Sequence, residues 1–359
     1  MKSICAVDLF CGAGGLTKGL KAAGIDVQLG VDLDPACGYP FTHNNGTRFL
    51  LRSVQKLTRK DILGAWRGAE FSLLAGCAPC QPFSLYSQGN TDETDGRWNL
   101  LAEFQRLVIQ TKPTLVTMEN VPRLAEQTIF RAFVTALKAA KYHVSFQVVK
   151  SADYGVPQKR ERLVLLASKL GPIDLIPPTH AKNPRTVRQA IRSLPRLIAG
   201  GQHPGDPLHQ TATLSPKNLR RIRASTPGGT WRDWDSRLVA ACHRKRSGKT
   251  YPSVYGRMSW DEPAPTMTTQ FFGFGNGRFG HPEQNRAISL REGAIIQSFP
   301  RAYRFVKPGQ PIHFKVLGRL IGNAVPVKLG KAIGRSLIKH ICNFELTERK
   351  KAARKARHR

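Results

Sequence analysis

The sequence has no apolar run long enough to cross a membrane, and its cysteines do not form a disulfide framework. No stretch approaches the roughly 20 apolar residues that span a bilayer. The seven cysteines are an odd, scattered set, unlike the paired spacing of small secreted domains. The first residues become acidic at Asp8 and glycine-rich at Gly12, unlike a signal peptide. We therefore expect a cytoplasmic protein without a membrane segment.

Acidic residues are scarce relative to basic ones. The 359 residues include 24 Asp and Glu against 56 Lys and Arg, which gives a formal net charge of +32. Such an excess favours a polyanionic partner, nucleic acid first and an anionic membrane surface second, over a merely solvated basic surface. Hydrophobic residues make up 41%, so the composition is globular and the length allows one large or two ordinary domains.

The segment Gly76–Ser84 contains two cysteines but too few ligands for a structural zinc site. Such a site requires four ligands, and Cys77 and Cys80 form a CxxC pair without a second pair elsewhere. The same spacing also fits a redox-active pair or two inert, buried cysteines. The apolar residues 71–75 predict a buried strand that leads directly into this proline-containing loop. We interpret Cys80 as a nucleophile held in place by the loop, and Cys77 as a packing residue.

The N-terminal residues predict a strand, a glycine loop and a helix. Residues 4–9 form an apolar strand, glycines follow at Gly12 and Gly14, and apolar residues then recur at helical spacing. The next apolar strand ends in Asp32, about 20 residues after the glycines, where an acid binds ribose hydroxyls in nucleotide-binding folds. The pattern predicts a nucleoside-containing cofactor, either a dinucleotide or S-adenosylmethionine.

Predicted strands and helices alternate up to residue 168. Apolar spacing predicts helices and strands in turn: a helix from residue 100, a strand over 114–118 that ends before Glu119, a helix over 130–140, and strands over 143–149 and 163–167. Such alternation predicts a doubly wound α/β domain with ligands at the carboxyl ends of its strands.

The composition changes after Gly171. Prolines mark a boundary, and residues 185–310 are rich in Arg, Gly, Pro and Trp but poor in long apolar runs. This predicts an irregular, loop-built domain that faces nucleic acid, with a solvated basic face as the alternative. A final helix is expected after Asn323, because apolar residues recur from Leu329 at helical spacing. The basic tail beyond it is expected to be disordered and attracted to phosphates.

Five short motifs resemble those of the DNA (cytosine-5)-methyltransferase family, in the family's order and at compatible spacing. They are Asp8-Leu9-Phe10-x-Gly12-x-Gly14-Gly15, Pro79-Cys80-Gln81, Glu119-Asn120-Val121, Gln158-x-Arg160-x-Arg162 and Gly322-Asn323-x-Val325. The resemblance covers nearly the whole chain and implies a Rossmann-like, S-adenosylmethionine-dependent methyltransferase domain with a second, smaller, irregular target-recognition domain. It implies these boundaries: a catalytic domain that begins with 1–184, a target-recognition domain over 185–312, a closing helix over 313–346 that returns to the catalytic domain, and a disordered basic tail over 347–359.

The resemblance also assigns roles to single residues. The catalytic set comprises the nucleophile Cys80, an acid for the N3 side of the base, and two arginines to promote thiolate formation and steady the base: Cys80, Glu119, Arg160 and Arg162. The set around the cofactor is Phe10, Gly12, Ala13, Gly14, Gly15, Asp32, Leu100, Asn323 and Val325. The family usually has an Asp-Ile-like pair before the nucleophile strand, whose acid meets the adenine amino group. Here Ser53-Val54 aligns with it, so Ser53 or the later Asp61 is the candidate.

The implied function is sequence-specific methylation of cytosine C5 in duplex DNA. The target base would be flipped out, attacked at C6 by Cys80 and methylated from S-adenosylmethionine. The resemblance further implies a bacterial, nucleoid-associated monomer, in a restriction-modification system with a cognate endonuclease that acts on the same site. Two rival functions are a tRNA cytosine-5 methyltransferase of the same fold and a catalytically silent DNA-binding homologue.

Overall fold

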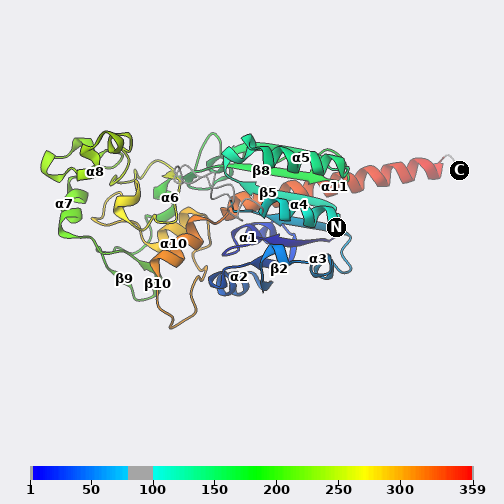
Figure 1. Cartoon of the computed structure of the whole chain (residues 1–359), viewed down its shortest axis with the longest axis horizontal. Helices are drawn as coiled ribbons and strands as arrows, with labels where there is room; N and C mark the ends of the chain where they lie inside the picture. The colour runs from blue at the N-terminus through cyan, green and yellow to red at the C-terminus, as the bar shows by residue number, and fades with distance from the viewer. Residues whose placement is uncertain (1–2, 80–99, 358–359) are drawn as a thin grey trace. The chain divides into compact units, whose positions relative to one another are not determined.

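The computed structural model describes residues 3–79 and 100–357, and a seven-stranded sheet forms the centre of its first part (Figure 1). The strands have the order β3-β2-β1-β4-β5-β8-β6. Their bounds are β1 Ile4–Leu9, β2 Asp26–Asp32, β3 Arg48–Leu51, β4 Phe71–Gly76, β5 Leu115–Asn120, β6 His143–Lys150 and β8 Glu161–Ser168. The first five strands pair in parallel, whereas β8 is antiparallel to β5 and β6. This confirms the predicted α/β fold.

Helices cover both faces of the sheet. In β1, Val7 and Leu9 point to one face and Asp8 to the other, because side chains alternate along a strand. The first face packs on a buried cluster with α3 (Arg59–Ala65), α4 (Leu100–Thr111) and α5 (Thr128–Ala139). On the second face, Asp8 is hydrogen-bonded to Thr17 of α1 (Gly15–Ala22), and α1 packs on α11 (Val327–Arg357). A further helix, α2 (Gly38–Asn45), follows β2.

The chain divides into two compact units. The first contains residues 1–150, 161–178 and 327–359, and the second contains 151–160 and 179–326. This division differs from the predicted boundaries, because residues 313–326, including α10 (Phe314–Gly322), belong to the second unit. Within residues 3–79 and 100–357, no helix is both long and apolar enough to span a bilayer.

The second unit has little regular structure. Its elements are short: β7 Gln158–Lys159, β9 Gln202–His203, β10 Asp206–Gln210, β11 Ala264–Pro265, α6 Val187–Ile191, α7 Pro216–Ala224, α8 Ala241–Arg244, α9 Leu290–Ile296 and α10. Buried arginines bind its loops together. Arg257 donates to the carbonyl oxygens of Ile222 in α7 and of three loop residues, Ser225, His281 and Gln284. Arg286 pairs with Glu292 through two hydrogen bonds of 2.7 and 2.8 Å, and both side chains are buried.

The end of the chain is helical where the sequence predicted disorder. Helix α11 continues through residues 347–357 of the basic tail. Ala, Lys and Arg are strong helix formers, and no Gly or Pro follows Gly334 to end the helix. The prediction of disorder rested on the high charge of this segment, whereas its helix propensity determines the structure.

Glycines allow α1 and α11 to pack closely. A Cβ on Gly19 would lie 2.5 Å from both the amide N of Lys331 and the carbonyl O of Val327. On the other helix, a Cβ at Gly334 would lie 2.6 Å from the Cβ of Ala23. These distances are shorter than van der Waals contact, so only glycine lets the backbones approach this closely.

We therefore predict opposite effects for two Gly-to-Ala substitutions. Gly19→Ala forces α1 and α11 apart and should lower the free energy of unfolding by about 1–3 kcal/mol. Gly64→Ala in α3 has nothing within 4 Å of the new Cβ and should raise it by about 0.5–1 kcal/mol through helix propensity. Urea unfolding of both variants measures the difference. Equal effects would contradict the close packing of α1 on α11.

Candidate active site

The segments that follow four parallel strands meet at one edge of the sheet. Strands β2, β1, β4 and β5 are parallel neighbours, so their carboxyl ends lie side by side. We call this the carboxyl edge and the opposite side the amino edge. Arg162 also lies at the carboxyl edge, because it is near the start of the antiparallel strand β8.

The glycine loop after β1 turns sharply through left-handed backbone conformations. Phe10, Gly12 and Gly14 have φ angles of 56°, 53° and 87°. Gly14 is the N-cap of α1 and donates its N–H to the carbonyl of Cys11 at 2.9 Å. A Cβ on Gly12 would meet nothing within 4 Å. The loop therefore leaves open space beside its backbone, in which a ligand could lie close to the main chain.

Asp32 joins the glycine loop to the end of β2. Its Oδ2 accepts a hydrogen bond from the N–H of Gly12 at 2.9 Å, and its Oδ1 accepts one from the N–H of Asp34 at 3.0 Å. The side chain is partly exposed. This geometry fixes the acid at the tip of the second strand, with lone pairs left for further donors.

Asp8 lies buried beneath the glycine loop. Its Oδ2 accepts a 2.6 Å hydrogen bond from the hydroxyl of Thr17 in α1, and the residue is 1% exposed. Burial raises the pKa of the Asp8 carboxyl to about 7; the Thr17 hydrogen bond lowers the pKa, and the negative charge of Asp32 raises it further. Asp8 begins the glycine motif, but the sequence alone predicted no separate role for it.

The two candidates for the adenine contact have different surroundings. Both oxygens of Asp61 are engaged, Oδ2 with the N–H and hydroxyl of Thr58 and Oδ1 with Arg52, so Asp61 caps α3. Ser53 follows β3, and the N–H of the preceding Arg52 donates to the carbonyl of Asp32 at 3.0 Å. Ser53 therefore lies beside Asp32 at the carboxyl edge.

A buried acid at the tip of β5 contacts a guanidinium group and a thiol. The Nε of Arg162 lies 3.1 Å from Oε1 of Glu119, and the thiol of Cys77 donates to Oε2 at 3.1 Å. Glu119 is 3% exposed and the Arg162 side chain 11% exposed. Residues from β5, β8 and the loop after β4 thus form one cluster. The polar contact of Cys77 was not predicted, although its CxxC spacing to Cys80 placed it near the predicted nucleophile.

Asn120 connects the tip of β5 to the loop after β4. Its Nδ2 donates to the carbonyl O of Ala78 at 3.0 Å, and its Oδ1 accepts from the N–H of Val121 at 2.7 Å. Ala78 precedes Cys80 by two residues, and Cys80 itself lies outside the described residues. Asn120 therefore fixes the start of the loop that carries the predicted nucleophile. The motif Glu119-Asn120-Val121 was the signal that could have identified it.

Arg160 and Arg162 belong to different units. Arg160 lies in the second unit, where it is buried and donates to the carbonyl oxygens of Met267 at 3.0 Å and Gly322 at 3.1 Å. Its guanidinium joins a loop to the end of α10, whereas Arg162 in the first unit contacts Glu119. The contacts therefore favour Arg162 as the arginine of the acid cluster.

The other predicted cofactor residues have separate positions. Leu100 is the first residue of α4 in the first unit. Asn323, the exposed C-cap of α10, and the buried Val325 belong to the second unit.

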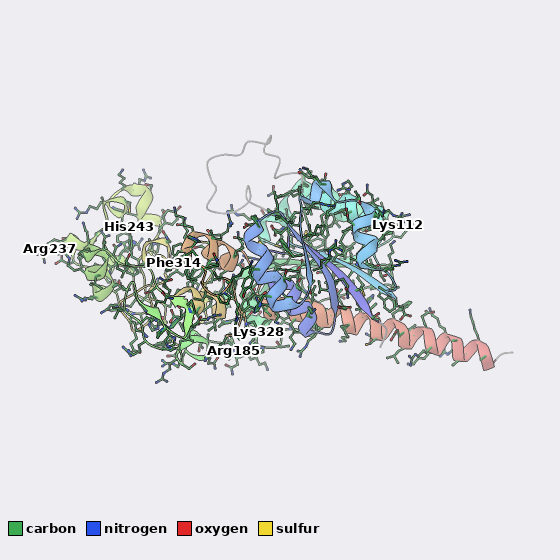
Figure 2. The ribbon with its side chains drawn as sticks, turned by 90° about the horizontal axis from the view of Figure 1, so that it is seen from below. Lys112, Arg185, Arg237, His243, Phe314 and Lys328 are labelled. Atoms are coloured by element: carbon green, nitrogen blue, oxygen red, sulfur yellow. The ribbon has the colours of Figure 1, made fainter. Side chains whose placement is uncertain are left out.

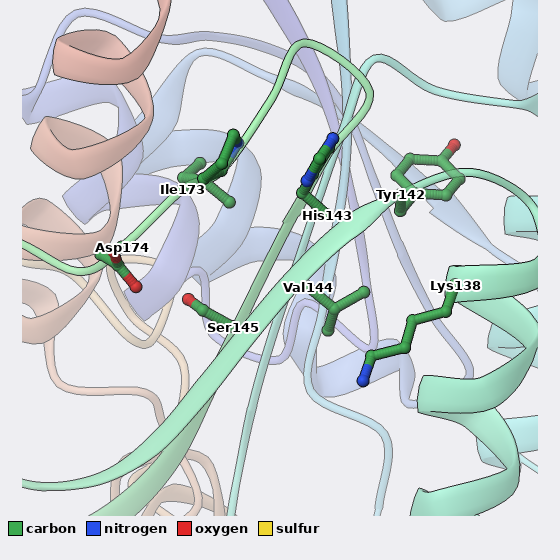
Figure 3. A pocket seen from close by; sticks show the side chains of 8 residues that line it. Lys138, Tyr142, His143, Val144, Ser145, Ile173 and Asp174 are labelled. Atoms are coloured by element: carbon green, nitrogen blue, oxygen red, sulfur yellow. The ribbon is translucent and has the colours of Figure 1, made fainter.

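One open cavity of about 370 Å³ lies in the first unit but away from these residues (Figure 3). It is lined by residues of α5, β6 and the segment after β8, among them Lys138, Tyr142, His143 and Asp174. His143 begins β6, which is antiparallel to β8 as β5 is, so the cavity lies toward the amino edge. It therefore takes no part in the carboxyl-edge cluster.

The Asp8 carboxyl predicts a specific pH dependence of stability. An unfolded Asp releases its proton near pH 4, whereas Asp8 in the folded protein retains it until about pH 7. The folded state therefore binds more protons in this window, and stability falls as pH rises through it. Asp8→Asn cannot ionise and keeps an acceptor for Thr17. Relative to the wild type, the variant should gain about 2–3 kcal/mol between pH 5 and pH 8, measured by urea unfolding. Parallel stability–pH curves would contradict the raised pKa.

Comparison with known proteins gives consistent matches over nearly the whole chain. Residues 4–339 match the family model of the C-5 cytosine-specific DNA methylases. The Type II methylase M.HgiDII of Herpetosiphon aurantiacus is 50% identical over 335 residues, which cover 92% of this chain and 94% of that protein. The Type II methyltransferase M1.HphI of Haemophilus parahaemolyticus is 32% identical over 343 residues, with coverage of 94% and 87%.

Solved structures share the fold. A candidate DNA modification methyltransferase encoded within an E. coli prophage has a TM-score of 0.73 at 23% identity, with coverage of 94% of this chain and 99% of that one. Spodoptera frugiperda DNMT2 has a TM-score of 0.64 at 19% identity, with coverage of 94% and 100%. The family model, which spans almost all of the sheet and the second unit, and the half-identical relative together show that this chain belongs to the C-5 cytosine-specific DNA methylase family.

Proposed function

We propose that the protein is a Type II DNA (cytosine-5)-methyltransferase that methylates a flipped-out cytosine through a covalent bond between Cys80 and C6. The observation that carries the proposal is the contact of Arg162 and Cys77 with Glu119, beside the segment that leads to Cys80. An acid, a cation and a loop that carries a thiol at the carboxyl edge are the groups that this chemistry requires.

The carboxyl edge fits S-adenosylmethionine as the cofactor. Open space lies beside Gly12, and Asp32 is fixed at the tip of β2 with lone pairs for a ribose. When bound, this cofactor supplies an electrophilic methyl group. The residues that the family resemblance implies around it are Phe10, Gly12, Ala13, Gly14, Gly15, Asp32, Leu100, Asn323 and Val325. Ser53 would meet the adenine amino group, because Ser53 follows β3 beside Asp32, whereas Asp61 lies in α3 and caps that helix.

Catalysis needs a nucleophile, because C5 of cytosine is itself a poor one. The Cys80 thiolate adds to C6, which gives C5 enamine character and places negative charge on N3 and O2. Glu119 gives a proton or hydrogen bond to N3, and Arg162 steadies O2 or the neighbouring phosphate. C5 takes up the methyl group; the C5 proton then passes to solvent water, the thiolate leaves C6 and the N3 proton returns to Glu119, which restores the aromatic ring and the free enzyme.

Two partners orient the carboxyl group of Glu119. Arg162 and Cys77 each contact a different carboxyl oxygen, so the group cannot rotate freely. Asn120 holds the loop that precedes Cys80 against the same strand tip. Together these contacts fix the acid and the start of the thiol loop relative to each other.

Duplex DNA fits the charge of the second unit. A target base inside a duplex must leave the stack to reach a nucleophile of the enzyme. Figure 2 labels Arg237 and His243 in the second unit. Residues 230–250 carry the exposed basic side chains Arg232, Arg237, Arg244, Lys245, Arg246 and Lys249. The rings of Trp231 and His243 in the same segment stack at 4.5 Å. Within the predicted target-recognition domain, residues 185–312, such basic side chains would bind phosphates while loops read base edges. We further propose a monomer, with a cognate restriction endonuclease that acts on the same site.

The direct test is methyl transfer from labelled S-adenosylmethionine to duplex DNA, with 5-methylcytosine located by sequencing and tRNA as the competing substrate. Cys80→Ser should lower transfer by about 1,000-fold or more, because a serine hydroxyl is a far weaker nucleophile than a thiolate, while cofactor binding persists. DNA with 5-fluorocytosine should trap an adduct on Cys80, since fluorine cannot leave as a proton does. Transfer to tRNA alone, or an adduct on another residue, would overturn the proposal.

A matched pair of arginine substitutions separates chemistry from folding. Arg162→Met removes the cation beside Glu119, and we expect kcat to fall by about 100-fold at temperatures where the variant is folded. Arg160→Met removes a donor from the buried carbonyls of Met267 and Gly322, of which Gly322 keeps the Gln297 amide, and we expect the unfolding free energy to fall by about 1–3 kcal/mol, with a lower Tm. Kinetics and thermal unfolding of both variants measure these effects. A larger kcat loss in Arg160→Met than in Arg162→Met would reverse the assignment.

A further inference from the structure

The last turns of α11 have no contact with the sheet. Buried residues recur along the helix up to Ile341, and partly buried ones up to Glu345. From Leu346 to Ala356 every residue is exposed. Figure 1 and Figure 2 show this part of the helix extending beyond the strands of the first unit. We call residues 346–356 the distal helix.

Basic residues dominate the distal helix. It contains the five cations Arg349, Lys350, Lys351, Arg354 and Lys355, and one acid, Glu348, which pairs with Lys351 at 2.9 Å. Spacing of four residues places Lys350 in line with Arg354, and Lys351 in line with Lys355. The like charges of this exposed helix repel one another. A partner with closely spaced negative charges would relieve this repulsion and bind the helix favourably.

The distal helix lies at the amino edge of the sheet. His340 contacts Ser168, the last residue of the antiparallel strand β8, and Phe344 packs edge-on against Phe71, the first residue of β4. The six residues of β4 span about 20 Å, and eleven helical residues from Phe344 to Lys355 add about 16 Å. The distal cations therefore lie on the order of 35 Å from the carboxyl edge.

Duplex DNA fits this helix better than a membrane surface does. An amphipathic helix that binds a bilayer inserts large apolar side chains such as Trp, Phe and Leu. The side opposite Lys350, Lys351, Arg354 and Lys355 carries Ala352, Ala353 and Ala356 together with Arg349, so it offers little apolar area to insert. Phosphates along a duplex provide the regular negative charge that a short basic helix can follow without an apolar partner.

We propose that the distal helix binds the phosphate backbone of a second DNA segment, separate from the duplex at the carboxyl edge. The inference rests on the proposed function for the position of the first duplex, but the contact itself requires only a long polyanion. A straight duplex that lies across the carboxyl edge does not reach the distal helix, because the helix lies on the order of 35 Å away along the direction of the strands. DNA has a persistence length of about 150 base pairs, so a second contact on the same molecule requires several hundred base pairs, or it joins two molecules.

The test compares a short duplex with long DNA. The variant replaces the five cations Arg349, Lys350, Lys351, Arg354 and Lys355 with Gln, which keeps the helix propensity. The matched control replaces Ala352, Ala353 and Ala356 with Gln and keeps every charge. With a target site in a 25-base-pair duplex, we expect equal kcat/KM for wild type, variant and control. With the same site in 1,000-base-pair DNA at low salt, the variant should lose about 10-fold, and the control should lose nothing.

A binding assay keeps the result independent of catalysis. Protein saturated with the labelled 25-base-pair duplex is added to long, non-specific DNA on beads. The wild type and control should carry the labelled duplex to the beads and the five-Gln variant should not, with circular dichroism showing that its helix content is unchanged. Loss of short-duplex binding in the variant would place the helix at the first duplex and overturn the proposal. Equal capture by all three proteins, or variant-sensitive binding to phosphatidylserine vesicles without DNA capture, would overturn it as well. Failure of methyl transfer with intact capture would affect only the proposed function.

Discussion

Parallel pairing of β2, β1, β4 and β5 is the constraint on which the rest of the first unit depends. Each strand contributes a different chemical group at its carboxyl end, and hydrogen bonds between neighbouring strands fix the spacing of these groups. The groups then bind one another across the strand tips: Gly12 with Asp32, Asn120 with Ala78, and Glu119 with Cys77. No insertion or helix is needed to gather them, because the sheet does so.

The second unit is held together mainly by side-chain hydrogen bonds and not by a sheet. It has few ladder hydrogen bonds, and buried guanidinium groups take their place by donating to several carbonyls at once. Arg160 does the same between a loop and α10. Such loops are free of the periodicity that a strand or helix imposes, so their exposed side chains can vary while the buried arginines keep the backbone in place.

Apolar runs that end in a polar residue predicted the sheet well. The strands before Asp32, the Cys80 loop and Glu119 are all present, because burial on both faces leaves a clear signal. Contacts between strand tips could not be predicted, since Cys77 and Glu119 are 42 residues apart and meet only through the pairing of β4 with β5. Arg160 and Arg162 looked equivalent, but β8 begins between them and places them in different units. The region of Ser53 and Asp61 had no clear periodicity, so the capping role of Asp61 was visible only in the structure.

The interrupted path of the chain has a consequence for exchange between relatives. Residues 179–326 form one continuous insertion between two segments of the first unit, so a recombination event with ends near Pro178 and Val327 would transfer them as a cassette. The incoming cassette must still pack with residues 151–160, which the host retains. It must offer a strand to pair with Gln158 and Lys159, and carbonyls at the positions of Met267 and Gly322 for Arg160. Loops elsewhere in the cassette need not keep these contacts. A host can therefore acquire a second unit with a different exposed surface in one recombination event.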